Sequence, residues 1–292
     1  MVLSQISVMA GRLSGCRGVR MKPFALSLCL FSLAFARPAS ALDERYPAYE
    51  PQPDLAGEVT IAAAPAPQSL MILWPEGFRM LQPGVAVIAA RGDNAGTVTV
   101  RAAVEALAVL VHKDNPLACL PLSALREIYT AENPHWGAAG ATGAWAAAPV
   151  MRFVREEGSS DNEFFKERVL GGASFAPGAE MVGRASQLLR KLEAAPGGIG
   201  YAPAGYRNEN LRPLKLSDGA DCMAPTMMNA WRADYPLARI VNLRGSAGEP
   251  SRSFFAYVLS QAGQHDATIA GHFPLPYVFA AEERKKLGLD RR

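Results

Sequence analysis

Short apolar runs alternate with segments of helical periodicity along most of the chain, and this order restricts the fold strongly. One such run, 104–111 (VEALAVLV), has the character of a strand that is covered on both faces. Other strands are predicted at 59–62, 85–88, 150–154, 199–202 and 237–243. Helices are predicted at 67–82 (with a kink or a restart at Pro75), 122–130, 160–170, 180–193 and 250–262. Repeated strand–helix–strand order predicts an α/β protein with a mainly parallel sheet.

Residues 1–41 have the three-part pattern of a secretory signal peptide. The apolar run 23–36 is too short to span a bilayer as a stable helix, basic residues precede it, and a small-residue site (ASA) ends at Ala41. Cleavage is predicted after that residue, and Met21 is an alternative start of translation. A membrane anchor or a buried helix is the alternative, and a lipoprotein is disfavoured because no small-residue pattern precedes Cys29. The chain is therefore predicted to be exported.

The charge of the chain is unevenly distributed. There are 30 basic and 27 acidic residues, and five of the basic residues but none of the acidic ones precede residue 42. The remainder is slightly acidic, so the sequence gives no electrostatic basis for binding nucleic acid. A content of 49% hydrophobic and 20% charged residues is ordinary for a globular protein and excludes a largely disordered chain.

Export would leave two cysteines, Cys119 and Cys222, in an oxidising compartment. An even pair there favours a single disulfide, and two buried free thiols are the alternative. No metal site is predicted, because neither cysteine has ligand spacing with any of the histidines, which are His112, His135, His265 and His272. The sequence has no Gly-x-Ser-x-Gly elbow, Walker loop or His-Glu-x-x-His motif, so we predict neither a cofactor nor an enzymatic activity.

Four segments, in the same order and with similar spacing, resemble the phosphate-binding proteins of bacterial ABC transporters. The first, 105–136, has that family's strand, Asn-Pro turn and helix ending near a tryptophan. The second, 151–172, is similar to its Arg-x-x-Gly-Ser-Gly-Thr segment and the helix that follows. The others are 197–206 (GGIGYAPAGY) and 235–275, while 57–84 fits the first strand and helix more loosely.

This resemblance implies a type II periplasmic-binding-protein fold, in which two hinged α/β lobes enclose an anion. After an extended lead-in at 42–56, the first lobe would comprise 57–107 with 226–292, and the second lobe 108–225. The ligand would be inorganic phosphate or a related oxyanion. The protein would lie in the periplasm and deliver this ligand to an ABC permease in the inner membrane.

By the same resemblance, the second lobe would bind the anion through Arg155, Gly158, Ser159, Ser160 and Asp161. An arginine can bind an oxyanion through two parallel hydrogen bonds, and hydroxyls and backbone N–H groups at a helix start complete such a site. The family has a threonine where Asp161 stands. A carboxylate there would repel a dianion unless it is protonated or accepts a hydrogen bond from a protonated ligand oxygen.

Some of these residues also have a purely structural explanation. Ser160 and Glu163 have the spacing of a helix capping box. Arg155 could form a salt bridge with Glu156, Glu157 or another exposed acid. Thr97, which faintly matches a ligand loop of the first lobe, could instead belong to a Gly/Asn/Asp turn.

The first lobe departs from the family pattern. Where the family has hydroxyl residues after its first strand, 63–67 read AAPAP, which offer no hydroxyl, and Ser69 is expected to be a solvated first-turn serine. The family's Ser-Arg segment is missing, and only Arg91 or Arg101 could replace its arginine. The sequence therefore predicts a shortened first lobe. It leaves a second hypothesis, an envelope accessory module that keeps the fold without the ligand, and a third, an exported hydrolase.

Overall fold

The computed structural model of the protein describes residues 42–290, apart from 64–66, 91–95, 207 and 220. Within these residues, one sheet of nine strands contains β1 (Gly57–Ala63), β2 (Val85–Ala89), β3 (Val98–His112), β5 (Met151–Arg155), β6 (Glu180–Val182), β7 (Gly198–Pro203), β8 (Leu211–Pro213), β10 (Ala238–Gly245) and β11 (Phe273–Pro274). A small second sheet pairs β4 (Cys119–Pro121) with β9 (Lys215–Ser217). The helices are α1 (Gln68–Leu81), α2 (Leu122–Thr130), α3 (Ser160–Phe165), α4 (Ala185–Glu193), α5 (Met227–Trp231), α6 (Glu249–Val258), α7 (Gln261–Ile269) and α8 (Tyr277–Lys286).

The strand order of the large sheet is β2-β1-β10-β3-β7-β5-β6, with β8 and β11 also paired to β3. Its two ends are parallel, because β1 pairs with β2 and β5 pairs with both β6 and β7 in that sense. Its middle is antiparallel, since β10 and β7 both run opposite to β3. The predicted α/β class is confirmed. The prediction of a mainly parallel sheet is wrong, because five of the eight pairings among the described strands of this sheet are antiparallel, a feature that a strand–helix pattern does not reveal.

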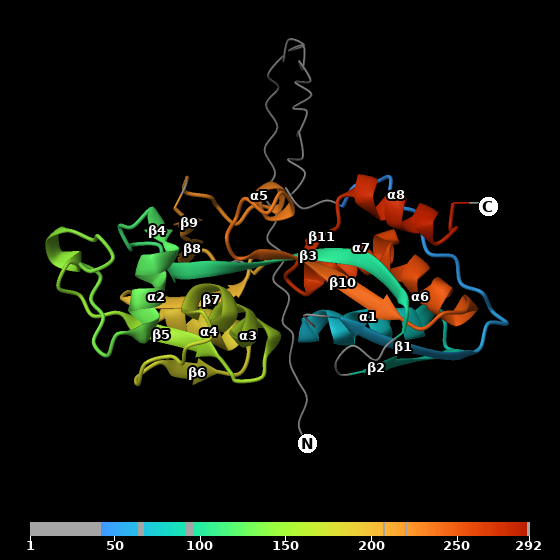
Figure 1. Ribbon diagram of the computed structural model, residues 1–292, viewed down its shortest axis with the longest axis horizontal. Coiled ribbons are helices and arrows are strands. Elements are labelled where there is room, and N and C mark those ends of the chain that lie inside the picture. Colours follow the sequence, from blue (N-terminus) through green and yellow to red (C-terminus); the bar gives the residue numbers. More distant parts are fainter. Residues whose placement is uncertain (1–41, 64–66, 91–95, 207, 220, 291–292) are drawn as a thin grey trace, which may run out of the picture. The chain divides into compact units, whose positions relative to one another are not determined.

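Strand β3 is much longer than the predicted run, and it passes through two hydrophobic cores. The first core lies between residues 59 and 103 and between residues 241 and 270, and α1, α6 and α7 contribute to it. The second core lies between residues 104 and 237, and α2 and α4 contribute to it. Figure 1 shows these two groups of elements, with β3 and β10 passing from one to the other. The described part of the chain is thus a two-lobed protein.

Three predicted helices differ in detail from the structure. Helix α1 runs without interruption through Pro75, because Trp74 and Phe78 are buried on either side of it in the first core. Residues 180–182 form β6, and α4 begins only at Ala185. The predicted helix 250–262 is two helices: α6 ends at Val258, and the Ser260 side chain accepts a hydrogen bond from the N–H of Gly263 at 3.4 Å to begin α7.

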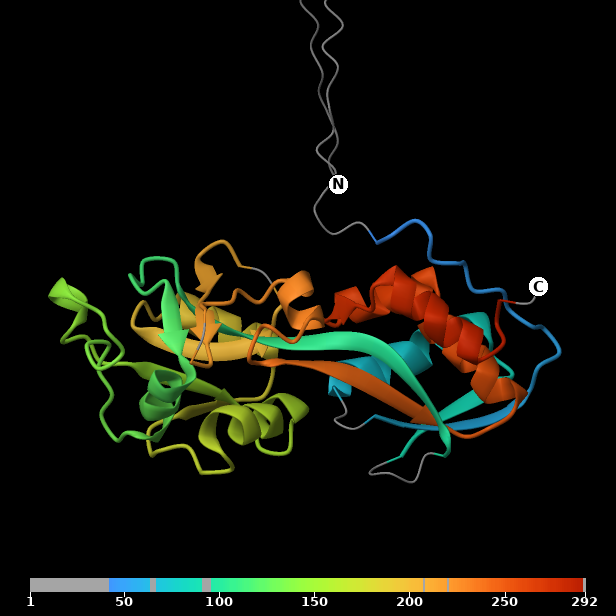
Figure 2. The ribbon, with the colours of Figure 1, turned by 45° about the horizontal axis from the view of Figure 1, so that its top comes forward.

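The predicted lead-in, 42–56, is extended and lies along α6 and α8, as Figure 2 shows from a second direction. Its tyrosines attach it to the rest of the chain. The Tyr46 hydroxyl donates to the carbonyl of Leu275, and the Tyr49 hydroxyl lies 2.7 Å from Ser253 Oγ. The lead-in therefore belongs to the folded structure.

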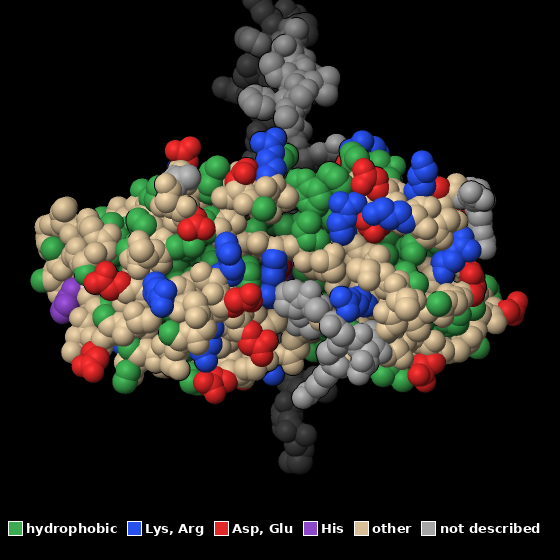
Figure 3. Space-filling model, viewed as in Figure 1, with side chains coloured by type: hydrophobic (Ala, Val, Ile, Leu, Met, Phe, Trp, Pro, Cys, Tyr) green, Lys and Arg blue, Asp and Glu red, His purple; other side chains and the backbone are tan. Residues whose placement is uncertain are grey.

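Aromatic packing joins α5 to α8. The rings of Trp231 and Phe279 are 3.9 Å apart at their centroids, and Trp231 also packs against the second core. Hydrophobic side chains gather between these two helices on the face drawn in Figure 3, and the exposed ones include Met227, Met228 and Val278. This contact is a second connection between the two groups of elements, in addition to β3 and β10.

The predicted disulfide is confirmed, since Cys119 and Cys222 are bonded with their Cα atoms 6.0 Å apart. It fastens β4 to the segment that precedes α5. None of the described helices is long and apolar enough to cross a membrane. The predicted signal peptide, 1–41, lies outside the described residues.

Candidate functional site

Arg155 and Asp161, both predicted from the sequence, lie together in the second core. Arg155 ends β5, and its Nε donates to Asp161 Oδ2 at 3.3 Å, while Nη1 donates to the carbonyl of Val182 at 3.3 Å. Both side chains are buried. Arg155 therefore does form a salt bridge, as the structural alternative predicts, but its partner is the buried carboxylate of Asp161 on α3 and not an exposed acid such as Glu156 or Glu157.

The turn from β5 into α3 is built by Gly158 and Ser159. Gly158 has a φ of +76°, a conformation that glycine adopts without strain. Ser159 is the N-cap, because its Oγ accepts from the N–H of Asn162 at 3.3 Å and donates to the carbonyl of Glu156 at 2.8 Å. The capping-box alternative, which begins at Ser160, is thus wrong by one residue.

An ion pair on the two central strands lies next to this turn, with its acid buried and its arginine partly buried. Glu105 on β3 is fully buried, and Arg239 on β10 is its cross-strand partner and donates through Nε to Glu105 Oε2. The same guanidinium lies 3.9 Å from the ring centroid of Phe164 and 3.5 Å from the carbonyl oxygen of Ser160. Arg239 therefore connects β10 to the beginning of α3.

The first core contributes a histidine. His272 is 2% exposed, and its Nε2 is 3.1 Å from the Oγ of Ser69, which lies in the first turn of α1. The prediction that Ser69 is simply solvated is therefore wrong. The Asp161 carboxylate and the Arg239 guanidinium both act electrostatically on the imidazole. We call Glu105, Arg155, Asp161, Arg239 and His272 the charged cluster.

Burial shifts the pKa values of the acids in the charged cluster upward. It raises the pKa of Asp161, and the nearby Glu105 charge raises it further, against the opposing effect of Arg155. Burial also raises the pKa of Glu105, although the Arg239 guanidinium acts in the opposite direction. Burial therefore opposes the charged form of both carboxylates, while the adjacent guanidiniums favour it.

Two buried polar atoms of the cluster have no hydrogen-bond partner among the described residues. They are Oε1 of Glu105 and Nδ1 of His272. Buried polar atoms are rarely left unpaired, because the loss of hydration costs about 1–3 kcal/mol each. A ligand or a water molecule in the cluster would satisfy them.

His272 makes the stability of the protein depend on pH. Burial lowers its pKa from 6.5 to about 4. Between these values the unfolded state binds more protons than the folded state. The free energy of unfolding therefore decreases as the pH is lowered, by up to about 3 kcal/mol. We expect His272→Gln to lose this dependence in urea titrations at pH 7, 5.5 and 4.5. An equal pH dependence in the variant and the wild type would contradict the assignment.

Thr97, the one predicted site residue from the first lobe, is not part of the charged cluster. It is exposed at the start of β3, about 25 Å along that strand from Glu105 at the usual rise per residue. Arg101 does not replace the missing family arginine either, since Glu282 and Glu283 of α8 hold it at 2.9 and 2.7 Å. Arg91 lies outside the described residues.

Sequence reasoning missed Glu105, Arg239 and His272. A signal existed for Glu105, because an acid inside an otherwise apolar strand must find a buried partner. Arg239 lies in the segment 235–275, where the sequence shows a resemblance to the family but no pattern that indicates a buried ion pair. His272 had no local signal, because its partner Ser69 is 203 residues away in the chain.

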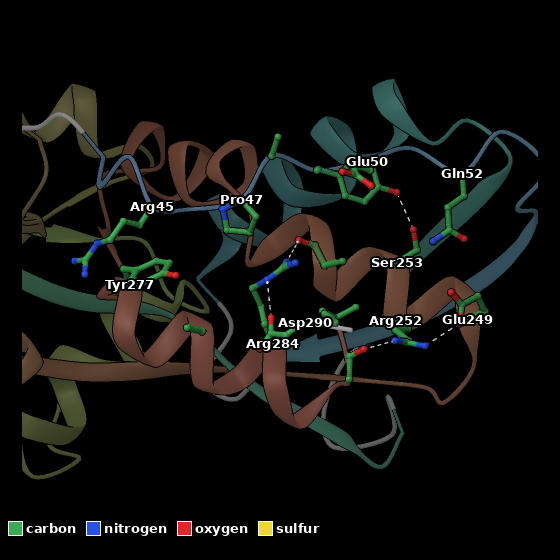
Figure 4. A pocket seen from close by; sticks show the side chains of 16 residues that line it. Arg45, Pro47, Glu50, Gln52, Glu249, Arg252, Ser253, Tyr277, Arg284 and Asp290 are labelled. Atoms are coloured by element: carbon green, nitrogen blue, oxygen red, sulfur yellow. Dashed lines mark hydrogen bonds and ion pairs between the residues drawn. The ribbon is translucent and has the colours of Figure 1, made fainter. Parts of the chain in front are cut away.

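A separate cavity of about 490 Å³ lies between the lead-in, α6 and α8 (Figure 4). Its charged side chains include internal ion pairs, since Arg252 is 3.7 Å from Glu249 and Arg284 is 3.7 Å from Asp290. None of the charged-cluster residues lines this cavity. The cavity is therefore distinct from the charged cluster.

Residues 79–243, more than half of the chain, match the family described as the PBP superfamily domain, and the chain belongs to that family. The phosphate-binding protein PstS of Pseudomonas aeruginosa is 27% identical to it, over 91% of this chain and 98% of that protein. The predicted resemblance is thereby confirmed.

Solved structures of similar proteins support the same fold. A possible phosphate-binding protein from Planctomyces limnophilus superimposes with a TM-score of 0.67 at 17% identity, covering 82% of this chain and all (100%) of that one. A putative phosphate ABC transporter substrate-binding protein from Clostridium perfringens, solved with bound phosphate, superimposes with a TM-score of 0.55 at 20% identity and covers 75% of this chain and 100% of that chain.

Proposed function

We propose that the protein is a periplasmic solute-binding protein that holds phosphate or a related oxyanion in the charged cluster and delivers it to an ABC permease. The observation that carries the proposal is a pair of guanidiniums, buried Arg155 and partly buried Arg239, beside buried carboxylates whose pKa values are raised. Removing an arginine's charge-assisted hydrogen bonds to a buried anion is costly, so this pair would dominate the affinity.

The proposed second-lobe site comprises Arg155 and the turn formed by Gly158, Ser159, Ser160 and Asp161. The cap bonds of Ser159 favour a structural role for its side chain, while its backbone stays beside Arg155. Thr97 is omitted because it lies outside the charged cluster, about 25 Å along β3 from Glu105 at the usual rise per residue.

We also propose the lobe boundaries given by the sequence, 57–107 with 226–292 for the first lobe and 108–225 for the second. The change of core along β3, between Ala103 and Val104, supports a boundary near residue 107. On the return the core changes only between Leu237 and Val241, so the second boundary would lie nearer β10 than residue 226.

Calorimetric titration of inorganic phosphate into the exported protein tests the proposal, after unfolding and refolding have removed any carried-over ligand. We expect micromolar or tighter binding, and we expect Arg155→Ala to weaken it by about 100-fold or more, since the loss of a buried charge pair costs about 2–5 kcal/mol. Arg252→Ala, which changes an arginine of the separate cavity, is the matched control and should bind as the wild type does. Unchanged affinity in a folded Arg155→Ala variant would refute the assignment.

One observation favours the second hypothesis, an accessory module without a ligand: each guanidinium of the cluster already has a carboxylate partner. Thermal melts distinguish the two. A ligand at 100 times its dissociation constant adds about 2.7 kcal/mol to the folded state, which would raise the melting temperature by about 5–10 °C for a chain of this size. Melts that do not change with phosphate, sulfate or molybdate would favour the accessory module.

A further inference from the structure

We propose that His272, positioned by Ser69, is the side chain through which the first lobe binds the oxyanion, with Nδ1 as the contacting atom. This inference rests on the proposed function, because it names a ligand contact within that site. It assigns to the first lobe a contact that the alanines at the end of β1, Ala62 and Ala63, cannot make.

The backbone fixes the place of this imidazole. Gly271, with a φ of +82°, accepts a hydrogen bond from the N–H of Gly205 at 2.8 Å, directly after β7 of the second core. A Cβ on Gly205 would lie 2.6 Å from the Gly271 carbonyl oxygen, so the two chains approach as closely as glycine allows. The N–H of His272 donates to the carbonyl of Ala267 at 2.9 Å. His272 is therefore held where α7 of the first core meets the end of β7.

The ring itself is fixed at one nitrogen and unpartnered at the other. Ser69 Oγ lies 3.1 Å from Nε2, while Nδ1 has no partner among the residues that the structure describes. The groups that act electrostatically on the ring are Asp161 on α3 and Arg239 on β10, both members of the charged cluster. The strand pairing gives the same placement, because Phe273 pairs with Val104 of β3, and Arg239 pairs with the next residue of β3, Glu105. The ring with the unpartnered atom therefore lies beside the Glu105–Arg239 pair of the charged cluster.

The chemistry of a neutral imidazole suits an oxyanion at this position. One of its nitrogens carries hydrogen and the other accepts, and the hydrogen bond at one nitrogen selects the tautomer. When the Ser69 hydroxyl donates to Nε2, the hydrogen is on Nδ1, which then donates to an oxygen of the anion. Ser69 is accordingly a positioning residue, and His272 is the binding residue.

Two substitutions separate the roles of the two ring nitrogens. The amide of asparagine can occupy the place of Nδ1, whereas the amide of glutamine reaches the place of Nε2. We expect His272→Gln to weaken phosphate binding about tenfold or more and His272→Asn to weaken it by less than about threefold. Ser69→Ala should give an intermediate loss, and His265→Gln, which changes an exposed histidine on α7, should give none.

Nitrogen NMR of the imidazole rings supplies a readout of phosphate binding in the wild-type protein itself. The chain has four histidines, so four ring systems are observed, and His272→Gln assigns one of them. Added phosphate should shift the Nδ1 resonance of His272 and leave those of His112, His135 and His265 unchanged. No shift, together with wild-type affinity in both His272 variants, would overturn the inference while leaving the proposed function intact. Absence of phosphate binding by the wild type would instead refute the proposed function, and this inference with it.

Discussion

Replacing Arg239 by methionine should lower the free energy of unfolding by about 3–5 kcal/mol, because it leaves a buried carboxylate without its counter-charge. Glu105 is fully buried in the middle of the sheet, and Arg239 supplies the one hydrogen bond that the described residues give to its carboxylate. Methionine preserves most of the side-chain volume against Phe164, so the loss reports the charge more than the packing. Urea unfolding at pH 7 measures it.

The pH supplies a control for this prediction. In the folded state burial raises the pKa of Glu105, so the folded protein binds more protons than the unfolded chain near that pKa, and stability falls as the pH rises through it. The defect of Arg239→Met should therefore be smaller at pH 5 than at pH 7. The double variant Arg239→Met with Glu105→Leu removes both charges and should recover most of the loss. A defect below about 1 kcal/mol, or no recovery in the double variant, would contradict the assignment.

Replacing both Cys119 and Cys222 by serine should destabilise the protein by about 4–5 kcal/mol, the value that the chain-entropy model gives for a loop of about a hundred residues. The two cysteines are 103 residues apart. At about 2–4 °C per kcal/mol, the melting temperature should fall by about 10–20 °C. Calorimetry of the wild type, with and without a reductant, measures the same effect independently.

The serine variant is its own control for the reductant. Dithiothreitol should lower the melting temperature of the wild type toward that of the variant and leave the variant unchanged. The disulfide holds a region with few other contacts between strands, since β4 and β9 pair over only three residues each. A fall of less than about 2 °C in both experiments would mean that the small sheet holds this region without the bond.

The sequence predicted the parts of the fold and site that depend on neighbouring residues. Helix α2 begins and ends where its apolar periodicity placed it, and Arg155, Gly158, Ser159 and Asp161 are brought together because a single strand-to-helix turn contains them all. Helix α1 shows the limit of such rules, since it continues through Pro75 as one helix and does not restart there.

The missed parts depend on contacts between distant residues. Glu105 faces Arg239 only because β10 returns antiparallel to β3 after 134 residues, and no local pattern encodes that pairing. His272 meets Ser69 because α7 packs beside α1, where the indole N–H of Trp74 donates to the Gly263 carbonyl at 2.8 Å. Glu105, Arg239 and His272 could therefore be recognised as members of the charged cluster only from the tertiary structure.

The position of β10 also sets the order in which the chain can fold during synthesis. Strands β1 and β3 are made early, yet in the sheet they are neighbours only through β10, which comes late in the sequence. Until residue 245 has been made, the first core lacks its central strand, and helices α6 and α7 follow later still. Pairings over such long separations form slowly. The first segment of the nascent chain therefore lacks its packing partners until synthesis is nearly finished, which would favour export of the chain in an unfolded form.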